Sequence, residues 1–345
     1  RRWLRQANPP LSALITEKVG KGWEKDLDRL KPLVRLADDA EVQARFQEIK
    51  RANKERLTQL IARQCGVTVD PASLFDTQVK RFHEYKRQLL NVLQVIGRYN
   101  RIKENPASVT VPRTVIFAGK AAPGYDMAKL IIRLVLDVAE TLNHDRSTSE
   151  MLKVAFIPDY KVSSAEIIIP GSELSEQIST AGTEASGTGN MKFALNGALT
   201  IGTMDGANIE IHDEVGAENI FIFGLDVAGA KALKAGSYDP WECYNRDPML
   251  RQALDMVRNG YFSPNDPSRY KPLVDSLLRG GDTYLLLADY ADYVRCQDEV
   301  DKVYRDPKAW TRRAIRNVAN MGKFSADRTI HGYAKEIWGI EPLDL

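Results

Sequence analysis

A glycine-rich segment, residues 182–192, places small hydroxyl side chains, a carboxylate and a lysine within one short stretch. Glycines let the backbone approach an anion closely, and free N–H groups at a helix start favour negative charge. The spacing does not match the P-loop, and the dinucleotide-binding fingerprint requires a glycine where Lys192 stands. The segment by itself therefore leaves two interpretations open, an anion-binding loop and an ordinary glycine-rich turn.

Lys192 closes this segment, at the start of an expected helix and next to the apolar residues Met191, Phe193 and Leu195. Apolar neighbours remove an amine from water, which lowers its pKa and makes it a nucleophile suited to a carbonyl cofactor. The alternative interpretation is an ordinary surface lysine at a helix start.

A second cluster, residues 80–87, contains five side chains that can carry positive charge. It lies between a short β-like run, Gln78–Val79, and a helix that we expect over residues 84–104. Cations at a helix start oppose the helix dipole, at a cost of roughly a few tenths of a kcal/mol per charge, and a bound phosphate would offset this cost. A solvated basic turn explains the cluster equally well. One short patch in a neutral chain offers little to a nucleic acid.

A third candidate is the loop 119–124 with Tyr125, which follows an expected strand. Ligands of open α/β sheets bind at the carboxyl ends of strands, although a plain strand-to-helix connection is also consistent with this loop. Three histidines, His144, His212 and His331, are scattered without ligand spacing, and we therefore expect no metal site.

Strands are expected to position these residues. The sequence has short apolar runs, each with a glycine or proline shortly after it, over 114–117, 154–157, 198–201 and 220–223. Helical patterns alternate with these runs, as over 127–142. The alternation predicts a doubly wound α/β fold with a parallel sheet that is covered on both faces. Amphipathic helices are expected over 41–64 and 84–104. The chain after residue 272 is expected to be mostly helical, with a last helix from Ser325 or Asp327.

Composition narrows the class of protein. The chain has 345 residues, of which 43% are hydrophobic and 27% charged, and its net charge of +2 gives no electrostatic case for nucleic acid binding. Three distant cysteines indicate a reducing compartment rather than a disulfide framework. Two charges interrupt the most apolar stretch, 130–139, which is also shorter than the ~20 residues of a membrane span. We expect a soluble, cytoplasmic protein.

The first residue is Arg1 rather than methionine, so we expect a processed chain or a piece of a longer one.

Two blocks, 184–193 and 196–208, closely resemble the cofactor segment of the α-glucan (glycogen, starch and maltodextrin) phosphorylases. Further signature segments of that family resemble residues 80–91, 118–125 and 174–183, in the same order, and the resemblance covers nearly the whole chain. It implies an α/β fold, a doubly wound Rossmann-like lobe with flanking helices. This lobe, residues 1–324, would be the C-terminal lobe of a two-lobe glycosyltransferase of the GT-B type. Residues 325–345 would form a helical segment that crosses to the N-terminal lobe.

The resemblance also implies an activity. Members of the family use inorganic phosphate to cleave α-1,4-glucans into glucose 1-phosphate with retention of configuration. Their cofactor is pyridoxal 5'-phosphate, whose phosphate acts as general acid and base, a role that suits a group with a second pKa near ~6. The expected partners are therefore α-1,4-glucan, inorganic phosphate and glucose 1-phosphate, with no nucleic acid and no membrane. The full-length protein is expected to be a cytoplasmic homodimer that acts in glycogen catabolism.

Roles in the family transfer to matching positions of this sequence. The residues expected to bind the cofactor are Lys192, Thr188, Gly187, Tyr160 and Lys86. Those expected to bind substrate are Glu184, Ser186, Gly187, Lys80 and Arg81. The catalytic set is Lys80, Arg81, Lys86 and Lys192. Tyr125 matches an aromatic residue that binds purine-like inhibitors in some members, and Lys161 departs from an arginine that is frequent in animal members.

Two alternative functions remain at this stage, a non-catalytic binding or interaction lobe and a nucleotide-sugar glycosyltransferase of the same two-lobe type. The second would carry no covalent adduct on Lys192. In the family the N-terminal lobe supplies a glycine-rich loop, an Asp and a His at the glucosyl site. We therefore expect the isolated chain to be inactive.

Overall fold

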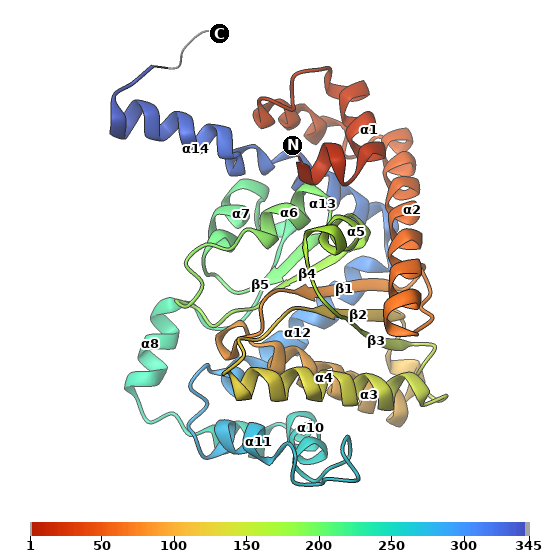
Figure 1. Ribbon diagram of the computed structural model, residues 1–345, viewed down its shortest axis with the longest axis vertical. Helices are drawn as coiled ribbons and strands as arrows, with labels where there is room; N and C mark the ends of the chain where they lie inside the picture. The colour runs from red at the N-terminus through yellow and green to blue at the C-terminus, as the bar shows by residue number, and fades with distance from the viewer. Residues whose placement is uncertain (1, 342–345) are drawn as a thin grey trace.

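A six-stranded parallel sheet forms the centre of the computed structural model, which describes residues 2–341 (Figure 1). Arg1 and the last four residues of the expected C-terminal segment, 342–345, lie outside the described part. The strands are β1 Leu74–Val79, β2 Arg113–Ala118, β3 Leu152–Ile157, β4 Leu174–Gln177, β5 Leu199–Gly202 and β6 Phe221–Ile222.

The strand order is β3-β2-β1-β4-β5-β6, and every neighbouring pair is parallel. The direction of winding reverses between β1 and β4, which is where ligands bind in open sheets of this kind. These two strands pair only at Asp76–Leu174 and Thr77–Ser175, two residues before each strand ends. A crevice can therefore form at this edge of the sheet. The doubly wound α/β prediction is confirmed.

Helices cover both faces of the sheet (Figure 1). The α-helices of the described residues are α1 Pro9–Val19, α2 Ala40–Cys65, α3 Gln88–Glu104, α4 Asp126–His144, α5 Val162–Gly171, α6 Gly189–Leu195, α7 Ala207–Val215, α8 Val227–Ala235, α9 Pro240–Arg246, α10 Pro248–Arg258, α11 Lys271–Leu278, α12 Leu286–Tyr304, α13 Pro307–Ala319 and α14 Ala326–Gly332. Short 3-10 or π turns, η1 Arg2–Gln6, η2 Leu27–Leu36, η3 Glu84–Lys86, η4 Pro106–Ser108, η5 Ala217–Asn219, η6 Met321–Phe324 and η7 Tyr333–Trp338, complete the described chain.

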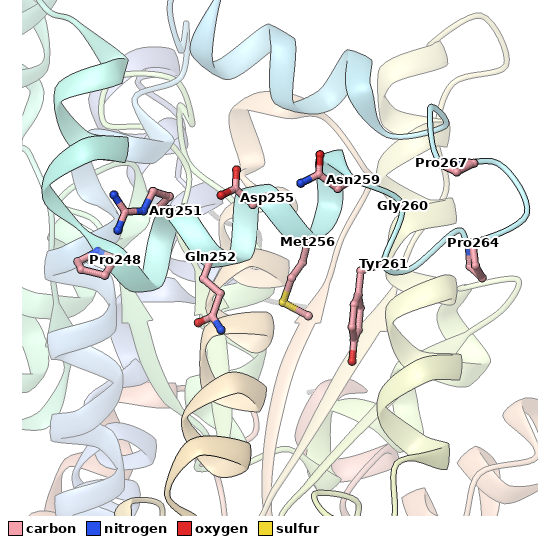
Figure 2. A pocket seen from close by; sticks show the side chains of 10 residues that line it. All are labelled: Pro248, Arg251, Gln252, Asp255, Met256, Asn259, Gly260, Tyr261, Pro264 and Pro267. Atoms are coloured by element: carbon pink, nitrogen blue, oxygen red, sulfur yellow. The ribbon is translucent and has the colours of Figure 1, made fainter.

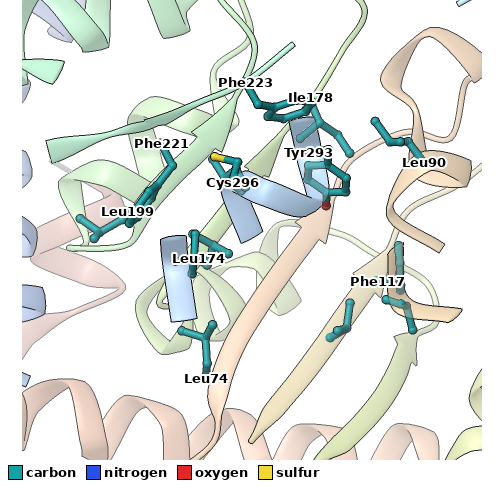
Figure 3. Close-up of a cluster of buried hydrophobic side chains, with 14 of the residues drawn as sticks. Leu74, Leu90, Phe117, Leu174, Ile178, Leu199, Phe221, Phe223, Tyr293 and Cys296 are labelled. Carbon is teal, nitrogen blue, oxygen red and sulfur yellow. The ribbon is translucent and has the colours of Figure 1, made fainter. Parts of the chain in front are cut away.

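Alternate residues of β2 enter two different cores. Val115 and Phe117 pack with α3, α4 and α12, whereas Ile116 and Ala118 pack with α2 and α5. Part of the first core is shown in Figure 3, where Leu174 and the neighbouring strands meet Tyr293 of α12. Because both faces are buried, the strand is apolar from Val115 to Ala118, and each large apolar side chain contributes about 1.5–3 kcal/mol on burial.

Of β1 only the β-like run Gln78–Val79 was recognised in the sequence. The strand β4 was not predicted at all, because its sequence Leu-Ser-Glu-Gln is mostly polar although all four residues are buried. Its polar side chains have partners inside the protein. Glu176 accepts hydrogen bonds from Tyr293 (2.9 Å) and Gln297 (2.7 Å) of α12. Burial, together with the neighbouring Asp76, raises the pKa of Glu176 well above its usual range. A buried polar network therefore replaces the apolar pattern by which the other strands were recognised.

The C-terminal helices α14 and η7 extend away from the body of the protein (Figure 1). Ser325 caps α14, so the predicted start of the last helix is confirmed. Their large apolar side chains are exposed, among them Ile337 (68%) and Trp338 (54%). Among the helices of residues 2–341, none combines the length and the apolar character needed to span a membrane.

Arg87 lies at the end of the basic cluster and is fully buried. Its guanidinium donates to the Asp289 carboxylate of α12 (2.6 Å) and to the carbonyl of Ile178 (2.7 Å), directly after β4. Arg87 adopts a left-handed conformation with φ of 56°, so α3 begins only at Gln88. The expected helix over 84–104 is therefore four residues too long at its start, because a residue with positive φ interrupts the helix there.

Substitution of Arg87 by methionine should lower the free energy of unfolding by about 3–5 kcal/mol, because Asp289 would remain buried without its cation. Urea denaturation of the purified chain measures this difference. The control is Arg51→Met, which removes an exposed ion pair with Glu55 and should cost less than about 1 kcal/mol. Equal effects of the two substitutions would contradict this account of the buried pair.

Candidate functional site

The glycine-rich loop follows β4 and leads into α6, with Gly187 at a positive φ of 84°. The carboxylate of Asp205, just after β5, accepts hydrogen bonds from the main-chain N–H groups of Thr183 (3.2 Å) and Glu184 (2.8 Å). Gly206 has a φ of 51°, and a Cβ on it would lie 2.6 Å from the carbonyl oxygen of Glu184. The loop is therefore held against the end of β5 by contacts that need a carboxylate and a glycine at these positions.

Lys192 lies within α6 and is half-buried, as its apolar neighbours predicted. Its amine donates to the hydroxyl of Thr188 (3.0 Å) and lies 4.9 Å from the centre of the Trp3 ring. Burial lowers the pKa of Lys192 below its ordinary value. The prediction of a partly desolvated amine is therefore confirmed, and the loop and the lysine are in direct contact.

The basic cluster does not lie in the first turn of a helix but in the connection from β1 to α3. Lys80 directly follows β1, and its amine donates to the side-chain oxygen of Gln177 at the end of β4 (2.7 Å). Burial, and then repulsion from Lys86, lower the pKa of Lys80 to about 8. The dipole conflict inferred from the sequence does not arise for Lys80 and Arg81, because six or more residues separate them from α3, whereas Lys86 and Arg87 directly precede this helix and have the carboxylates of Glu184 and Asp289 as partners. The cluster instead places its cations at the crevice between β1 and β4.

Lys86 forms an ion pair with Glu184 of the glycine-rich loop. Burial opposes the charged form of Lys86, but this ion pair raises its pKa above the ordinary value. A Cβ on Gly189 would lie 3.8 Å from the side-chain nitrogen of Gln177. The basic segment and the loop, which lie about 100 residues apart, therefore meet around the end of β4.

The third candidate loop belongs to the same region. A Cβ on Gly119 would lie 2.0 Å from the carbonyl oxygen of Lys80, so only glycine allows this close approach. The hydroxyl of Tyr125 donates to the carboxylate of Glu84 (2.6 Å), and the Tyr125 ring contacts His83 with 4.8 Å between ring centres. The loop 119–124 therefore packs against the basic segment.

The remaining predicted site residues differ in burial. Tyr160 is partly buried beside the core formed by α2 and α5, and burial raises its pKa. Arg81 and Ser186 are exposed. Solvent therefore reaches the guanidinium of Arg81 and the hydroxyl of Ser186 in this chain.

Three residues that contact the site were not singled out from the sequence: Trp3, Gln177 and Asp205. Asp205 lies inside the second resemblance block, and its position three residues after a strand could have identified it. Gln177 ends the polar strand that the apolar pattern missed. Trp3 lies far from the loop in sequence and has no local signal.

Lys192 and Thr188 line a cavity of about 460 Å³, which Trp3 and Phe324 also line. A separate surface groove of about 890 Å³ runs along α10 (Figure 2). None of the predicted site residues lines this groove, so we place the candidate site at the crevice and not at α10. Within residues 2–341, no group of three or more His, Cys, Asp or Glu side chains is placed to hold a metal ion.

Lys80 should make the stability of the chain depend on pH. Its pKa is about 8 in the folded chain and ~10.4 in an unfolded one, so between these values the unfolded chain binds more protons. The free energy of unfolding should therefore rise with pH from 8 to 10, by about 2 kcal/mol at most. Urea denaturation at several pH values would measure this slope. Lys80→Met should remove it, Lys231→Met on exposed α8 should keep it, and an equal slope in both variants would contradict the prediction.

The family model for carbohydrate phosphorylases matches residues 1–340. The brain form of glycogen phosphorylase is 52% identical in Mus musculus, over 345 residues, and 54% identical in Bos taurus, over 342 residues. The human muscle form is 52% identical over 342 residues. These matches cover 99–100% of the chain but only 40–41% of the length of the relatives. The chain belongs to the carbohydrate phosphorylase family.

Proposed function

We propose that the protein containing this chain transfers glucosyl units from α-1,4-glucan to inorganic phosphate and releases glucose 1-phosphate with retained configuration. The observation that supports this most is the convergence of Lys80, Lys86 and Glu184 at the crevice between β1 and β4. Two cations and a carboxylate at one strand edge suit a site that binds phosphate beside a sugar. The family membership of the chain supports the same reaction.

The chain would form the C-terminal lobe of a two-lobe enzyme of the GT-B type. Its six parallel strands, with helices on both faces, suit such a lobe. The partners that we propose are α-1,4-glucan, inorganic phosphate and glucose 1-phosphate. A cytoplasmic homodimer is the form that we propose for the whole protein, with no role for nucleic acid or a membrane.

The residues present fit pyridoxal 5'-phosphate. One end of the site is formed by the half-buried amine of Lys192, whose pKa is lowered. The hydroxyl of Thr188 lies 3.0 Å from this amine, and the ring of Trp3 lies beside it. The adjoining cavity of about 460 Å³ falls in the usual range of small-molecule pockets. Lys192, Thr188, Gly187, Tyr160 and Lys86 would hold the cofactor.

The residues of this chain would then bind and orient. When bound, the cofactor supplies a phosphate group that exchanges protons near neutral pH. Lys86 would neutralise part of that charge. Lys80 and Arg81 would hold the substrate phosphate, with Arg81 able to donate two parallel hydrogen bonds. Glu184, Ser186 and the main chain of Gly187 would bind the hydroxyl groups of the glucosyl unit.

Lys192 should carry the cofactor covalently in the full-length protein. Borohydride reduction followed by intact-mass and peptide analysis should find one adduct, on Lys192, and Lys192→Ala should lose it. The same substitution should reduce glucose 1-phosphate formation by roughly 100-fold or more, since the proton-exchanging group would no longer be held.

The matched control is Lys231→Ala, which should keep both the adduct and the activity. Normal phosphorolysis by Lys192→Ala without the cofactor would refute the proposal, and so would an adduct elsewhere. A nucleotide-sugar glycosyltransferase would show no adduct at all. The isolated chain should form no glucose 1-phosphate, and activity of the chain alone would contradict the two-lobe arrangement.

The lobe would end near residue 324, and we propose that the segment from 325 onward packs against the N-terminal lobe. The support is the exposure of Ile330, Tyr333 and Ile337 on α14 and η7. Apolar side chains that remain in water contribute little to the stability of this chain.

Removal of residues 326–345 should therefore change the free energy of unfolding of the isolated chain by less than about 1 kcal/mol. Removal from Met321 onward should cost clearly more, because Met321 is buried in the core. Urea denaturation of both truncated chains tests this. A cost of several kcal/mol for the shorter deletion would show that the segment belongs to the lobe itself.

A further inference from the structure

Gln177 joins the two strands at which the winding of the sheet reverses, and its side chain holds the Lys80 amine. We propose that Gln177 is a positioning residue, which presents the Lys80 amine to the substrate phosphate. This inference rests on the function proposed above and adds a residue to its site.

The Lys80 amine makes a single hydrogen bond within residues 2–341, to the side-chain oxygen of Gln177 at 2.7 Å. Lys80 directly follows β1 and Gln177 is the last residue of β4, so this bond spans the crevice. An ammonium group has three N–H donors. One is used by Gln177, and the other two remain for an anion.

The orientation of the Gln177 amide is set by the Lys80 ammonium, which can only donate. The amide nitrogen donates to the hydroxyl of Ser175 (2.9 Å), and both residues are buried. A reversed amide would point its N–H₂ group at the Lys80 ammonium, where two donors would face each other. The main chain of Gln177 is held as well, because its carbonyl accepts a hydrogen bond from Asn208 of α7 (2.9 Å). The acceptor for Lys80 is therefore rigid.

An amide and a carboxylate at this position would have different effects. Gln177 orients Lys80 but leaves its positive charge uncompensated, whereas Glu184 forms an ion pair with Lys86. Burial lowers the pKa of Lys80 to about 8, so the amine is still mostly protonated at neutral pH. A glutamate at position 177 would pair with Lys80 and compete with phosphate for its charge. The neutral amide therefore suits a lysine that must bind an incoming anion.

The test is Gln177→Glu in the full-length protein, a change that keeps the shape of the side chain. The first readout is the acetylation rate of Lys80 by acetic anhydride at pH 8, which peptide mass spectrometry quantifies. Acetylation should slow about fivefold, because a carboxylate raises the pKa of the amine by about one unit and so lowers its neutral fraction at pH 8 from about one half to about one tenth. The second readout is kinetic: the KM for inorganic phosphate should rise about tenfold, with a smaller change in kcat. Gln64→Glu, on the exposed side of α2, is the matched control and should change neither.

Ser175→Ala provides a second variant, which keeps Gln177 but frees its amide. This substitution should change the acetylation rate of Lys80 and the KM for phosphate measurably, but less than Gln177→Glu does. It serves as the test if Gln177→Glu does not fold. The proposal would be overturned if a folded variant kept both the acetylation rate of Lys80 and the KM for phosphate within twofold of the wild-type values. If the wild-type protein forms no glucose 1-phosphate, the proposed function fails, and the acetylation rates still decide whether Gln177 holds Lys80.

Discussion

The buried guanidinium of Arg87 connects three parts of the chain that the site requires. It bonds to the carbonyls of Ile178 and Ser179, to the Asp289 carboxylate and to the carbonyl of Leu285 at the start of α12. A buried charge is stable only when its hydrogen-bond donors have acceptors, because the protein interior solvates a charge much less well than water does. Since Ile178 and Ser179 directly follow β4, this interaction also sets the direction in which the chain leaves the sheet towards the glycine-rich loop.

Three lysines of the candidate site meet three different environments. Lys86 has a carboxylate partner, Lys80 has an amide and Lys192 has a hydroxyl beside an aromatic ring. Burial disfavours the charged form of all three, but only the ion pair of Lys86 reverses the net direction of the shift. One short region can thus hold a fixed cation, a cation free for an anion and a more nucleophilic amine. Under the function proposed above, Lys80 would bind the substrate phosphate, Lys86 would lie beside the cofactor phosphate and Lys192 would hold the cofactor.

Much of the fold followed from local pattern. The apolar strands β2, β3, β5 and β6 were predicted because strands buried on both faces are apolar throughout. The polar strand β4 escaped this pattern, since its side chains belong to the network around Glu176. The start of α3 was also predicted wrongly, because an arginine at position 87 gives no sign that its backbone has a positive φ. Both errors lie at the crevice, where polar groups and unusual backbone conformations are needed for binding.

The sequence by itself determined the fold class, the family, the glycine-rich loop and the partial desolvation of Lys192, because each depends on residues close in the chain. The tertiary structure alone decided that Lys80 meets Gln177, that Lys86 meets Glu184 and that Trp3 covers Lys192. The physical reason is that parallel strands are joined by long crossovers, so neighbours in the sheet are distant in the chain. Which strand ends meet depends on the packing of both cores together, and no local pattern carries that information.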